Sequence, residues 1–376
     1  MDRAVTVRVR DVVTAISTAF PPDRAEPWDR VGLLAGDASA EVTGVALSLD
    51  PTLQAVANAA AVGANVLVTH HPAFLSAPER VLAGRGPAGV VHAAVASGVA
   101  LVNAHTNLDR DARAQELMGF SLGLVPVAPL ERSTMDVSVV TAFVPDASVE
   151  AVVAAMTDAG AGRIGAYEGC AFTTSGTGGF TAPWGSDPAV GAAGEATAAA
   201  EVRVEMVCPR SSAARVVLAA AAAHPYEEPL VEAVDATIAR NAWRLGRICE
   251  PDGEITLEDL VGRAVALYGV TPRVWGDPDT VLRSIATATG SAGSLVPDAV
   301  AAGADALVAG EVRYHDALEA RASGLCVVEV GHDASEWPLV GLLHEVVLGV
   351  EGLEAADVHA LEPAIGWWTP RENGSA

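Results

Sequence analysis

The sequence contains no lysine, so all 23 of its basic Lys and Arg positions are arginine. Lysine Schiff-base chemistry and a Walker-type phosphate loop both need a lysine, and the sequence therefore excludes them. Cysteine is scarce too, and its four residues lie far apart without a CxxC pair. This pattern argues against a zinc ribbon and against a disulfide framework. The cysteines are Cys170, Cys208, Cys249 and Cys326.

Positive charge is in short supply overall. The chain has 376 residues and a formal net charge of −24, and its acidic residues are spread out rather than gathered in runs. Such a surface repels nucleic acid and anionic membranes, so we expect neither as a partner. A polyanionic substrate would need a local cation, which a bound metal can supply.

Long apolar runs are also missing, and the first residues lack the apolar core of a signal peptide. The Ala-rich run at 219–223 is short and ends at His224 and Pro225. We therefore expect a soluble cytoplasmic protein without a membrane partner. Apolar residues make up 51% of the chain, which is enough for a packed core, and the length leaves room for two or three domains.

The most informative stretch is Gly63–Pro72, in which an apolar run ends in His70 and His71. A short apolar run between Gly and Pro predicts a buried strand. Ligands bind at the carboxyl ends of strands in open α/β sheets, and imidazole is the commonest metal-ligand side chain. Two polar residues that merely close a strand are the alternative, and this stretch alone does not decide between the two interpretations.

Strands and helices alternate around this stretch. We expect helices over residues 7–20, 53–62 and 90–97, and strands over 45–49, 66–68 and 99–104. This alternation indicates βαβ units and a largely parallel sheet.

From about Met135 the pattern changes to strand, helix, strand and again strand, helix, strand. The predicted segments are 137–144, 149–159, 202–207, 212–223 and a run up to Val234. This order is typical of a small ferredoxin-like domain. The Gly-rich segment 160–194 lacks the Walker spacing and opens no helix after a strand, which favours turns over a phosphate site.

After about Asn241 the first pattern returns as an internal repeat. Residues 302–311 parallel 62–71, and residues 323–332 parallel 97–105. The predicted fold class is therefore α/β, with two related α/β half-domains forming one metal-binding domain that is interrupted by a ferredoxin-like α+β insert. Such an insertion is tolerated because the cost of loop closure grows slowly with length. We expect the first half at 1–130, the insert at 131–238 and the second half at 239–376.

The repeat places polar side chains at four strand ends, and none of them is a cysteine. They are His70 with His71, His105 with Asp109, Glu311, and His332 with Glu336. Mixed histidine and carboxylate ligands suit Mn, Fe, Co, Ni or Zn. A helix that starts at or near Ser335 would point His332 and Glu336 at one centre. The set His70, His71, Asp109, His332 and Glu336 is too large for one open zinc site and suits two divalent metals roughly 3.5–4 Å apart.

Five motifs follow one another along nearly the whole chain: Glu26-Pro27-Trp28-Asp29-Arg30-Val31-Gly32-Leu33, Thr69-His70-His71-Pro72, Ala104-His105-Thr106-Asn107-Leu108-Asp109, Gly310-Glu311-Val312-Arg313-Tyr314-His315-Asp316-Ala317 and Gly331-His332-Asp333-Ala334-Ser335-Glu336. In these motifs and their order the chain resembles the Nif-three-like dinuclear metal-centre family, also known as GTP cyclohydrolase 1 type 2 homologues. The insert, with Gly162-Arg163-Ile164-Gly165 and His224-Pro225-Tyr226-Glu227-Glu228-Pro229, resembles the PII-like or CutA-like domain of the long members.

The resemblance implies that two metals are bound by His70, His71, Asp109, His332 and Glu336, with a bridging carboxylate. It also implies a toroidal homohexamer whose sites face an internal cavity. Arg30 and Glu311 stand where the family usually has Asn and Asp, and neither is a predicted ligand.

Metal-dependent hydrolysis of a small molecule is the leading functional hypothesis, and the family name suggests ring opening of GTP. Two metals lower the pKa of water and stabilise a developing oxyanion. His105 would act as general acid/base, or would hold the loop that presents Asp109. The alternative is a non-enzymatic metal chaperone, insertion factor or store with a regulatory insert. A third, weaker reading is a PII-like regulatory module, with effector binding in the Gly-rich segment.

Overall fold

The computed structural model describes residues 6–26, 28–165, 167–239 and 243–363. Pro27 of the first motif lies outside these residues, as do residues 1–5 and 364–376 at the ends of the predicted half-domains. The chain divides into two compact units. One comprises the chain up to Glu131 and from Trp243 onward, and the other runs from Arg132 to Ala242.

The first unit contains a five-stranded sheet, here called the first sheet, in the order β1-β4-β3-β2-β17. Strands β4, β3, β2 and β17 are parallel to their neighbours, and β1 pairs antiparallel with β4. The predicted parallel arrangement is thus confirmed here. The strands are β1 (Gly32–Ala35), β2 (Val45–Ser48), β3 (Val66–Thr69), β4 (Ala100–Asn103) and β17 (Val358–Ala360).

The three central strands are buried along their whole length, because helices cover both faces of a parallel sheet. The apolar side of the first helix contributes Val12 and Ile16 to the core on one face. The helices are α1 (Val9–Ala19), α2 (Leu53–Ala61) and α3 (Gly86–Ala96). All three fall where the periodicity predicts them.

A second sheet in the same unit has the order β12-β16-β15-β14-β10-β5. Only β14, β15 and β16 run parallel, and β12, β10 and β5 pair antiparallel. The largely parallel prediction is wrong for these outer strands. The strands are β5 (Leu124–Pro129), β10 (Arg247–Pro251), β12 (Arg273–Trp275), β14 (Ile285–Ser291), β15 (Ala306–Glu311) and β16 (Cys326–Glu329).

The surrounding elements of this sheet are a small antiparallel pair and three helices. These are β11 (Ile255–Thr256), β13 (Val281–Leu282), α8 (Leu257–Tyr268), α9 (Val296–Ala301) and α10 (Tyr314–Ala322). The arrangement β14-β15-β16 with antiparallel β12 beside β16 matches β2-β3-β4 with antiparallel β1 beside β4.

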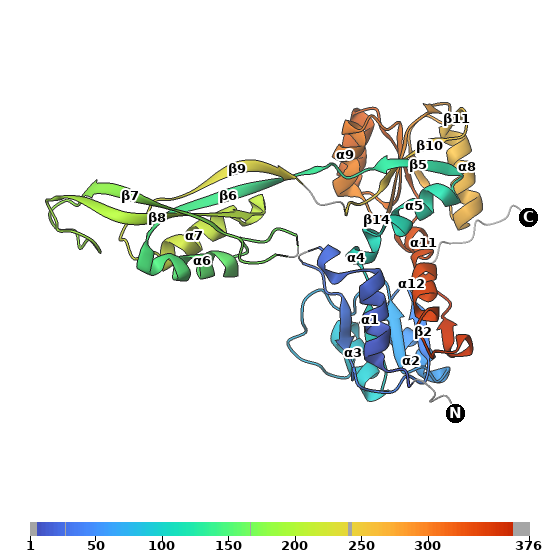
Figure 1. Cartoon of the computed structure of the whole chain (residues 1–376). Coiled ribbons are helices and arrows are strands. Elements are labelled where there is room, and N and C mark those ends of the chain that lie inside the picture. Colours follow the sequence, from blue (N-terminus) through green and yellow to red (C-terminus); the bar gives the residue numbers. More distant parts are fainter. Residues whose placement is uncertain (1–5, 27, 166, 240–242, 364–376) are drawn as a thin grey trace, which may run out of the picture. The chain divides into compact units, whose positions relative to one another are not determined.

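The two sheets exchange the helices that follow their last central strand. Helices α4 (Thr106–Asp109) and α5 (Ala112–Ser121) follow β4, while α11 (His332–Glu336) and α12 (Leu339–Leu348) follow β16. Leu122, directly after α5, is buried in the core of the second sheet, whereas Leu343 of α12 is buried in the core of the first. Figure 1 shows α12 beside α1 and α5 beside β5. Each sheet therefore depends on the other's helix.

The second unit is a four-stranded antiparallel sheet in the order β7-β8-β6-β9, with two helices packed on one face (Figure 1). Met156 and Val216 of these helices are buried against Val204 and Met206 of β8. The elements, in chain order, are β6 (Thr134–Pro145), α6 (Val149–Asp158), β7 (Phe172–Thr181), β8 (Ala196–Cys208), α7 (Ala213–Ala223) and β9 (Val231–Ala239).

Part of the Gly-rich segment forms strand β7, so the prediction of turns is wrong there. Gly176, Gly178 and Gly179 pair with the Ala-rich start of β8, and this ladder outweighs the low strand propensity of glycine. At Gly178 a Cβ atom would lie 2.1 Å from a carboxylate oxygen of Glu201, so a larger residue there would require the Glu201 side chain to move. Among the described residues, no helix combines the length and the apolar character needed to cross a bilayer.

Candidate metal centre

Strand β3 delivers two adjacent histidines to its carboxyl end. The backbone amides of His70 and His71 still donate to the carbonyls of Ser48 and Leu49, at 3.3 and 2.9 Å, so the end of β2 fixes both residues. The His70 side chain is fully buried, and that of His71 is 21% exposed.

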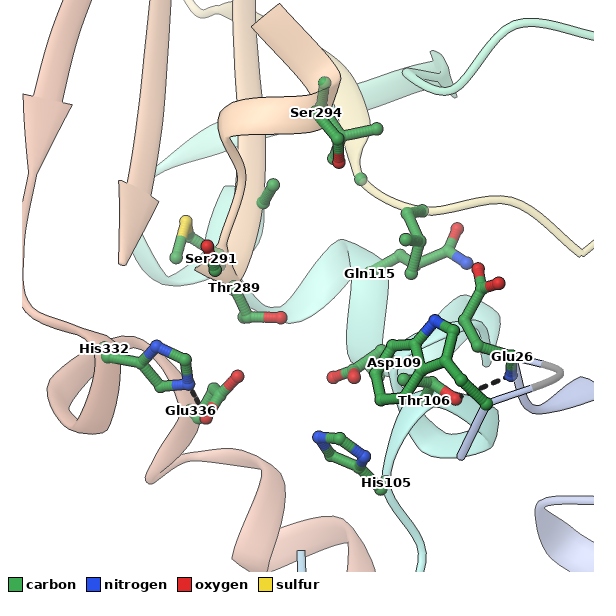
Figure 2. A pocket seen from close by; sticks show the side chains of 17 residues that line it. Glu26, His105, Thr106, Asp109, Gln115, Thr289, Ser291, Ser294, His332 and Glu336 are labelled. Atoms are coloured by element: carbon green, nitrogen blue, oxygen red, sulfur yellow. Dashed lines mark hydrogen bonds and ion pairs between the residues drawn. The ribbon is translucent and has the colours of Figure 1, made fainter. Parts of the chain in front are cut away.

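Two short helices bring the carboxylates. Asp109 closes α4, which follows β4, and Glu336 closes α11, which follows β16. Helix α11 begins at His332 rather than near Ser335, so one turn separates His332 from Glu336. Their side chains consequently meet, with 3.1 Å between His332 Nε2 and Glu336 Oε2. Figure 2 shows His332 and Glu336 on one side of the site, with His105 and Asp109 across from them.

The Glu336 carboxylate lies at the middle of the cluster. Its Oε2 is 2.9 Å from His71 Nε2, and its Oε1 is 3.7 Å from His70 Nε2. Asp109 Oδ1 lies 3.5 Å from the same nitrogen of His70. Among the described residues, three groups of side chains could hold a metal ion. One is His70, His71 and His105. The other two are His70, Asp109 and Glu336, and His71, His332 and Glu336, and Glu336 is the residue that these two have in common.

Each of the four histidines of the cluster contacts a carbonyl or carboxylate oxygen through its Nδ1 atom. This leaves Nε2 free to face the centre, which is the usual arrangement of metal-binding histidines. The Nδ1 partners of His70, His71, His105 and His332 are, in that order, the Ala104 carbonyl at 3.0 Å, Asp50 at 2.7 Å, Asp29 at 2.9 Å and Glu311 at 3.2 Å.

Two atoms that face each other here are buried without a hydrogen-bond partner, namely His70 Nε2 and Asp109 Oδ1. Leaving such atoms unpaired is costly, and a cation between them would remove the cost. Burial also raises the pKa of the Asp109 carboxyl. The donor set therefore fits a metal that takes nitrogen and oxygen ligands.

Close contacts among these side chains shift several of their pKa values. Burial works against protonation of His71, but the hydrogen bonds with Asp50 and Glu336 outweigh it and raise its pKa to about 10. The hydrogen bond with Glu336 raises the pKa of His332 to about 9. Burial works to raise the pKa of Glu336, but the hydrogen bonds with His332 and His71 and the nearby His70 ring outweigh it and hold this pKa well below its usual range. Metal binding must therefore displace protons.

His105 lies closer to the centre than the sequence suggests, because one of its nitrogens falls within 4.8 Å of ligand atoms of His70 and His71. Its partner Asp29 is buried and also accepts from the backbone and hydroxyl of Thr106, at 3.0 and 2.6 Å. Burial works to raise the pKa of Asp29, but the interactions with His105 and Thr106 lower it to about 2. The ionised Asp29 carboxylate thus accepts a hydrogen bond from Nδ1 of His105 and fixes the orientation of that ring.

Sequence analysis missed Asp29, Asp50 and Gly290. Asp29 lies within the motif Glu26–Leu33, and Asp50 lies just after the end of β2. These positions were the signal in the sequence that could have identified the two residues. Gly290, at the end of β14, has φ +59°, and a Cβ atom there would lie 2.1 Å from Glu336 Oε1. Because Gly290 has no side chain, it leaves room for the Glu336 carboxylate. Glu311 contacts His332 but belongs to neither of the two groups that include Glu336.

A cavity of about 420 Å³ adjoins the cluster (Figure 2). His105, Asp109, His332 and Glu336 line it on the side of the cluster. Its other lining residues are Glu26, Trp28, Thr106, Ala114, Gln115, Met118, Leu245, Gly246, Ala288, Thr289, Ser291, Ser294 and Leu295.

Comparison with known proteins finds a family match over most of the chain. The model of the Duf34/NIF3 (NGG1p interacting factor 3) family matches residues 7–359. A Mycobacterium tuberculosis protein named GTP cyclohydrolase 1 type 2 homolog is 35% identical over 91% of this chain and 92% of its own length. A Staphylococcus aureus protein of the same name is 28% identical over 87% and 89%.

Solved structures show the same fold. A Bacillus cereus protein related to NIF3 is 28% identical, with a TM-score of 0.60 over 95% of this chain and 97% of the other. A Staphylococcus aureus protein is 25% identical, with a TM-score of 0.64 over 97% and 99%. The mixed α/β architecture with several sheets is therefore shared with these structures.

Proposed function

Because the chain belongs to the Duf34/NIF3 family, we propose that it is a dinuclear metal protein that catalyses metal-dependent hydrolysis. In this proposal His70 and Asp109 hold one ion and His71 and His332 the other. The observation that carries it is the position of Glu336, whose two oxygens face different histidines. Each oxygen can bind one ion, and no histidine could bridge in this way. The ions would be Zn, Fe, Mn, Co or Ni, since the donors are nitrogen and oxygen.

When bound, such ions activate water and polarise a carbonyl. The chain's own residues supply the rest of the chemistry. With Nδ1 fixed on Asp29, His105 presents Nε2 to the cavity, where it can accept or deliver a proton. The buried Asp29 carboxylate keeps the ring in one orientation during that transfer. We therefore propose His105 as general acid/base and Asp29 as the residue that positions it.

Turnover by the metal-loaded protein tests this proposal. The substrates to offer are cyclic amides, phosphoesters and nucleotides, since GTP appears in the relatives' name. Asp109→Ala should abolish turnover because one ion loses a ligand, whereas His315→Ala, an exposed histidine outside the cluster, should leave it intact. Full activity in Asp109→Ala would place the chemistry elsewhere.

A metal chaperone, insertion factor or store is the second candidate. One observation favours it: the His332 side chain is 37% exposed, and its partner Glu311 is 56% exposed, so an ion held by His332 would lie near solvent. Incubation of the metal-loaded protein with an apo-acceptor distinguishes the two. Metal transfer without turnover of any substrate supports the chaperone.

We further propose that the insert is a ferredoxin-like, PII-like or CutA-like module between two related half-domains. Its element order and the strand order β7-β8-β6-β9 support this. A groove of about 960 Å³ on the insert, lined by Phe180, Glu201 and Tyr226 among others, supports a regulatory ligand-binding role. Joining the chain across a deletion of about 135–234 should leave a folded, metal-binding remainder. Loss of metal by that product would mean that the insert is part of the core.

The toroidal homohexamer stays a prediction from the family resemblance. Light scattering of the purified chain tests it directly. A mass near six times the 38.2 kDa of one chain is the expected result, and a monomeric mass would reject it.

A further inference from the structure

The cavity beside the candidate metal centre is lined by hydroxyl, apolar and aromatic side chains. One part of its wall carries the hydroxyl groups of Thr289, Ser291 and Ser294, which both donate and accept hydrogen bonds. Figure 2 shows these three residues on the side of β14, across from Glu26 and Thr106. The hydroxyls are neutral, so they recognise polar groups of a ligand without favouring a charge.

Apolar groups and one indole complete the wall. Met118 and Leu295 contribute aliphatic surface. Trp28 is 53% exposed and meets the His105 ring edge to face, with 6.0 Å between ring centroids. An aromatic face of this kind packs well against a flat ring. The volume of about 420 Å³ suits a small molecule.

No arginine lines the cavity among the described residues, and the chain has no lysine. The nearby Arg110 is buried and already engaged: it pairs with Glu26, lies 3.1 Å from Glu131, and donates to the Trp243 carbonyl at 2.6 Å. Its charge is thus offset by two carboxylates, one of which, Glu26, lines the cavity. Apart from the metal cluster, the protein offers nothing that would neutralise a chain of phosphates.

We propose that this cavity binds a small, flat, uncharged heterocycle with a cyclic amide, its carbonyl directed at the metal centre, and that it discriminates against phosphorylated forms. The proposal rests on the metal centre proposed above and names the class of its substrate. The indole and aliphatic wall would hold the ring, and the three hydroxyls would bind its polar edge. Glu26 would repel phosphate groups through the negative field it creates at the wall.

A series of ligands that share one ring and differ in charge tests the proposal. The probes are guanine, guanosine, GMP and GTP, and the readout is calorimetric affinity for the metal-loaded full chain. We expect guanosine to bind at least tenfold more tightly than GTP, with GMP between them. Higher salt should narrow the gap because it screens charge. GTP binding tenfold more tightly than guanosine would overturn the proposal.

The variant Glu26→Gln tests whether the Glu26 carboxylate causes the weaker binding of phosphorylated ligands. Without the carboxylate, the charge of Arg110 is offset only by Glu131, so GMP and GTP should bind at least threefold more tightly than to the wild type, while guanosine is unchanged. Glu319→Gln, at an exposed position of α10 outside the cavity, removes the same charge and should change none of the affinities. Equal effects of both variants would contradict the assignment to Glu26.

The metal content of each sample separates the two proposals. If the protein holds its metal but binds none of the four probes, the proposed substrate class is wrong and the metal centre stands. If the protein holds no metal after reconstitution, the proposed function fails and the substrate class falls with it.

Discussion

The central strands of the first and second sheets have the same arrangement, but the side chains at the ends of these strands differ. Strand β3 is followed by His70 and His71, whereas the corresponding strand β15 ends in Gly310 and Glu311. The first sheet therefore has two imidazole side chains at this position. The second offers a carboxylate that instead holds His332 from behind.

The short helices after β4 and β16 show the same kind of difference. Each presents a histidine and, four residues later, a carboxylate: His105 with Asp109, and His332 with Glu336. Asp109 is one methylene shorter and lies near His70, whereas the longer Glu336 faces histidines on both sides. The difference in side-chain length thus leaves Asp109 beside His70 and places Glu336 among His70, His71 and His332.

The last residues of β4 and β16 differ in charge. Asn103 ties the edge strand of the first sheet through the Arg30 carbonyl, at 2.9 Å. Glu329 does the equivalent in the second sheet by pairing with Arg273 and accepting from Trp275 at 3.0 Å. At this position a neutral amide fastens the edge strand of the first sheet, and a titratable carboxylate fastens that of the second.

The exchange of helices between the sheets predicts the largest effect. Leu343→Ala removes a fully buried side chain and should lower the free energy of unfolding by about 2–5 kcal/mol. Hydrogen exchange should become faster mainly in the first sheet, although Leu343 follows the second. Leu122→Ala is the mirror test, with faster exchange in the second sheet. Faster hydrogen exchange in the sheet that precedes each helix in the sequence would contradict the assignment of each helix to the other sheet.

Gly290→Ala should give an intermediate effect. A side chain at its positive φ costs about 1–2 kcal/mol, and the new Cβ atom would also displace the Glu336 carboxylate. Gly303→Ala is the matched control, because Gly303 has φ +71° with nothing within 4 Å of a new Cβ atom. Thermal unfolding should show similar losses for both variants, and metal analysis should show loss only for Gly290→Ala. Equal metal content would mean that Gly290 does not make room for the carboxylate.

The smallest effect concerns Glu329. Burial works to raise its pKa, but hydrogen bonds from Arg273, Val312 and Trp275 outweigh it and hold the pKa below its usual 4.5. A lowered folded-state pKa stabilises the protein above the unfolded value, and this stability is lost as pH falls through the folded value. Glu329→Gln should therefore cost about 1 kcal/mol or less at pH 7, because Arg273 is exposed and screened, and should cost nothing near pH 2.

Urea unfolding of Glu329→Gln and wild type across this pH range provides the measurement. Glu319→Gln, at an exposed position of α10, serves as the control, and its difference from wild type should not change with pH. A constant difference between Glu329→Gln and wild type would show that Glu329 is not the titrating group.

The sequence predicts most of the strand ends at this centre because periodicity reveals where a buried strand stops. It places His70, His71 and His105 directly after β3 and β4 for that reason. It could not predict that α5 and α12 change sheets, since an apolar helix face fits either core. Nor could it find Asp29 as the partner of His105, because 76 residues separate the two and only the folded chain brings them together.

The count of metal ions per chain in wild type and in Glu336→Gln tests the central claim most directly. Wild type should carry close to two first-row transition metals after reconstitution. Glu336→Gln should lose at least one while circular dichroism stays unchanged, because two neighbouring dications lose the anion between them. Asp109→Asn should lose one at most, and His315→Ala should keep both. Two metals in Glu336→Gln, or one or none in wild type, would contradict the shared carboxylate.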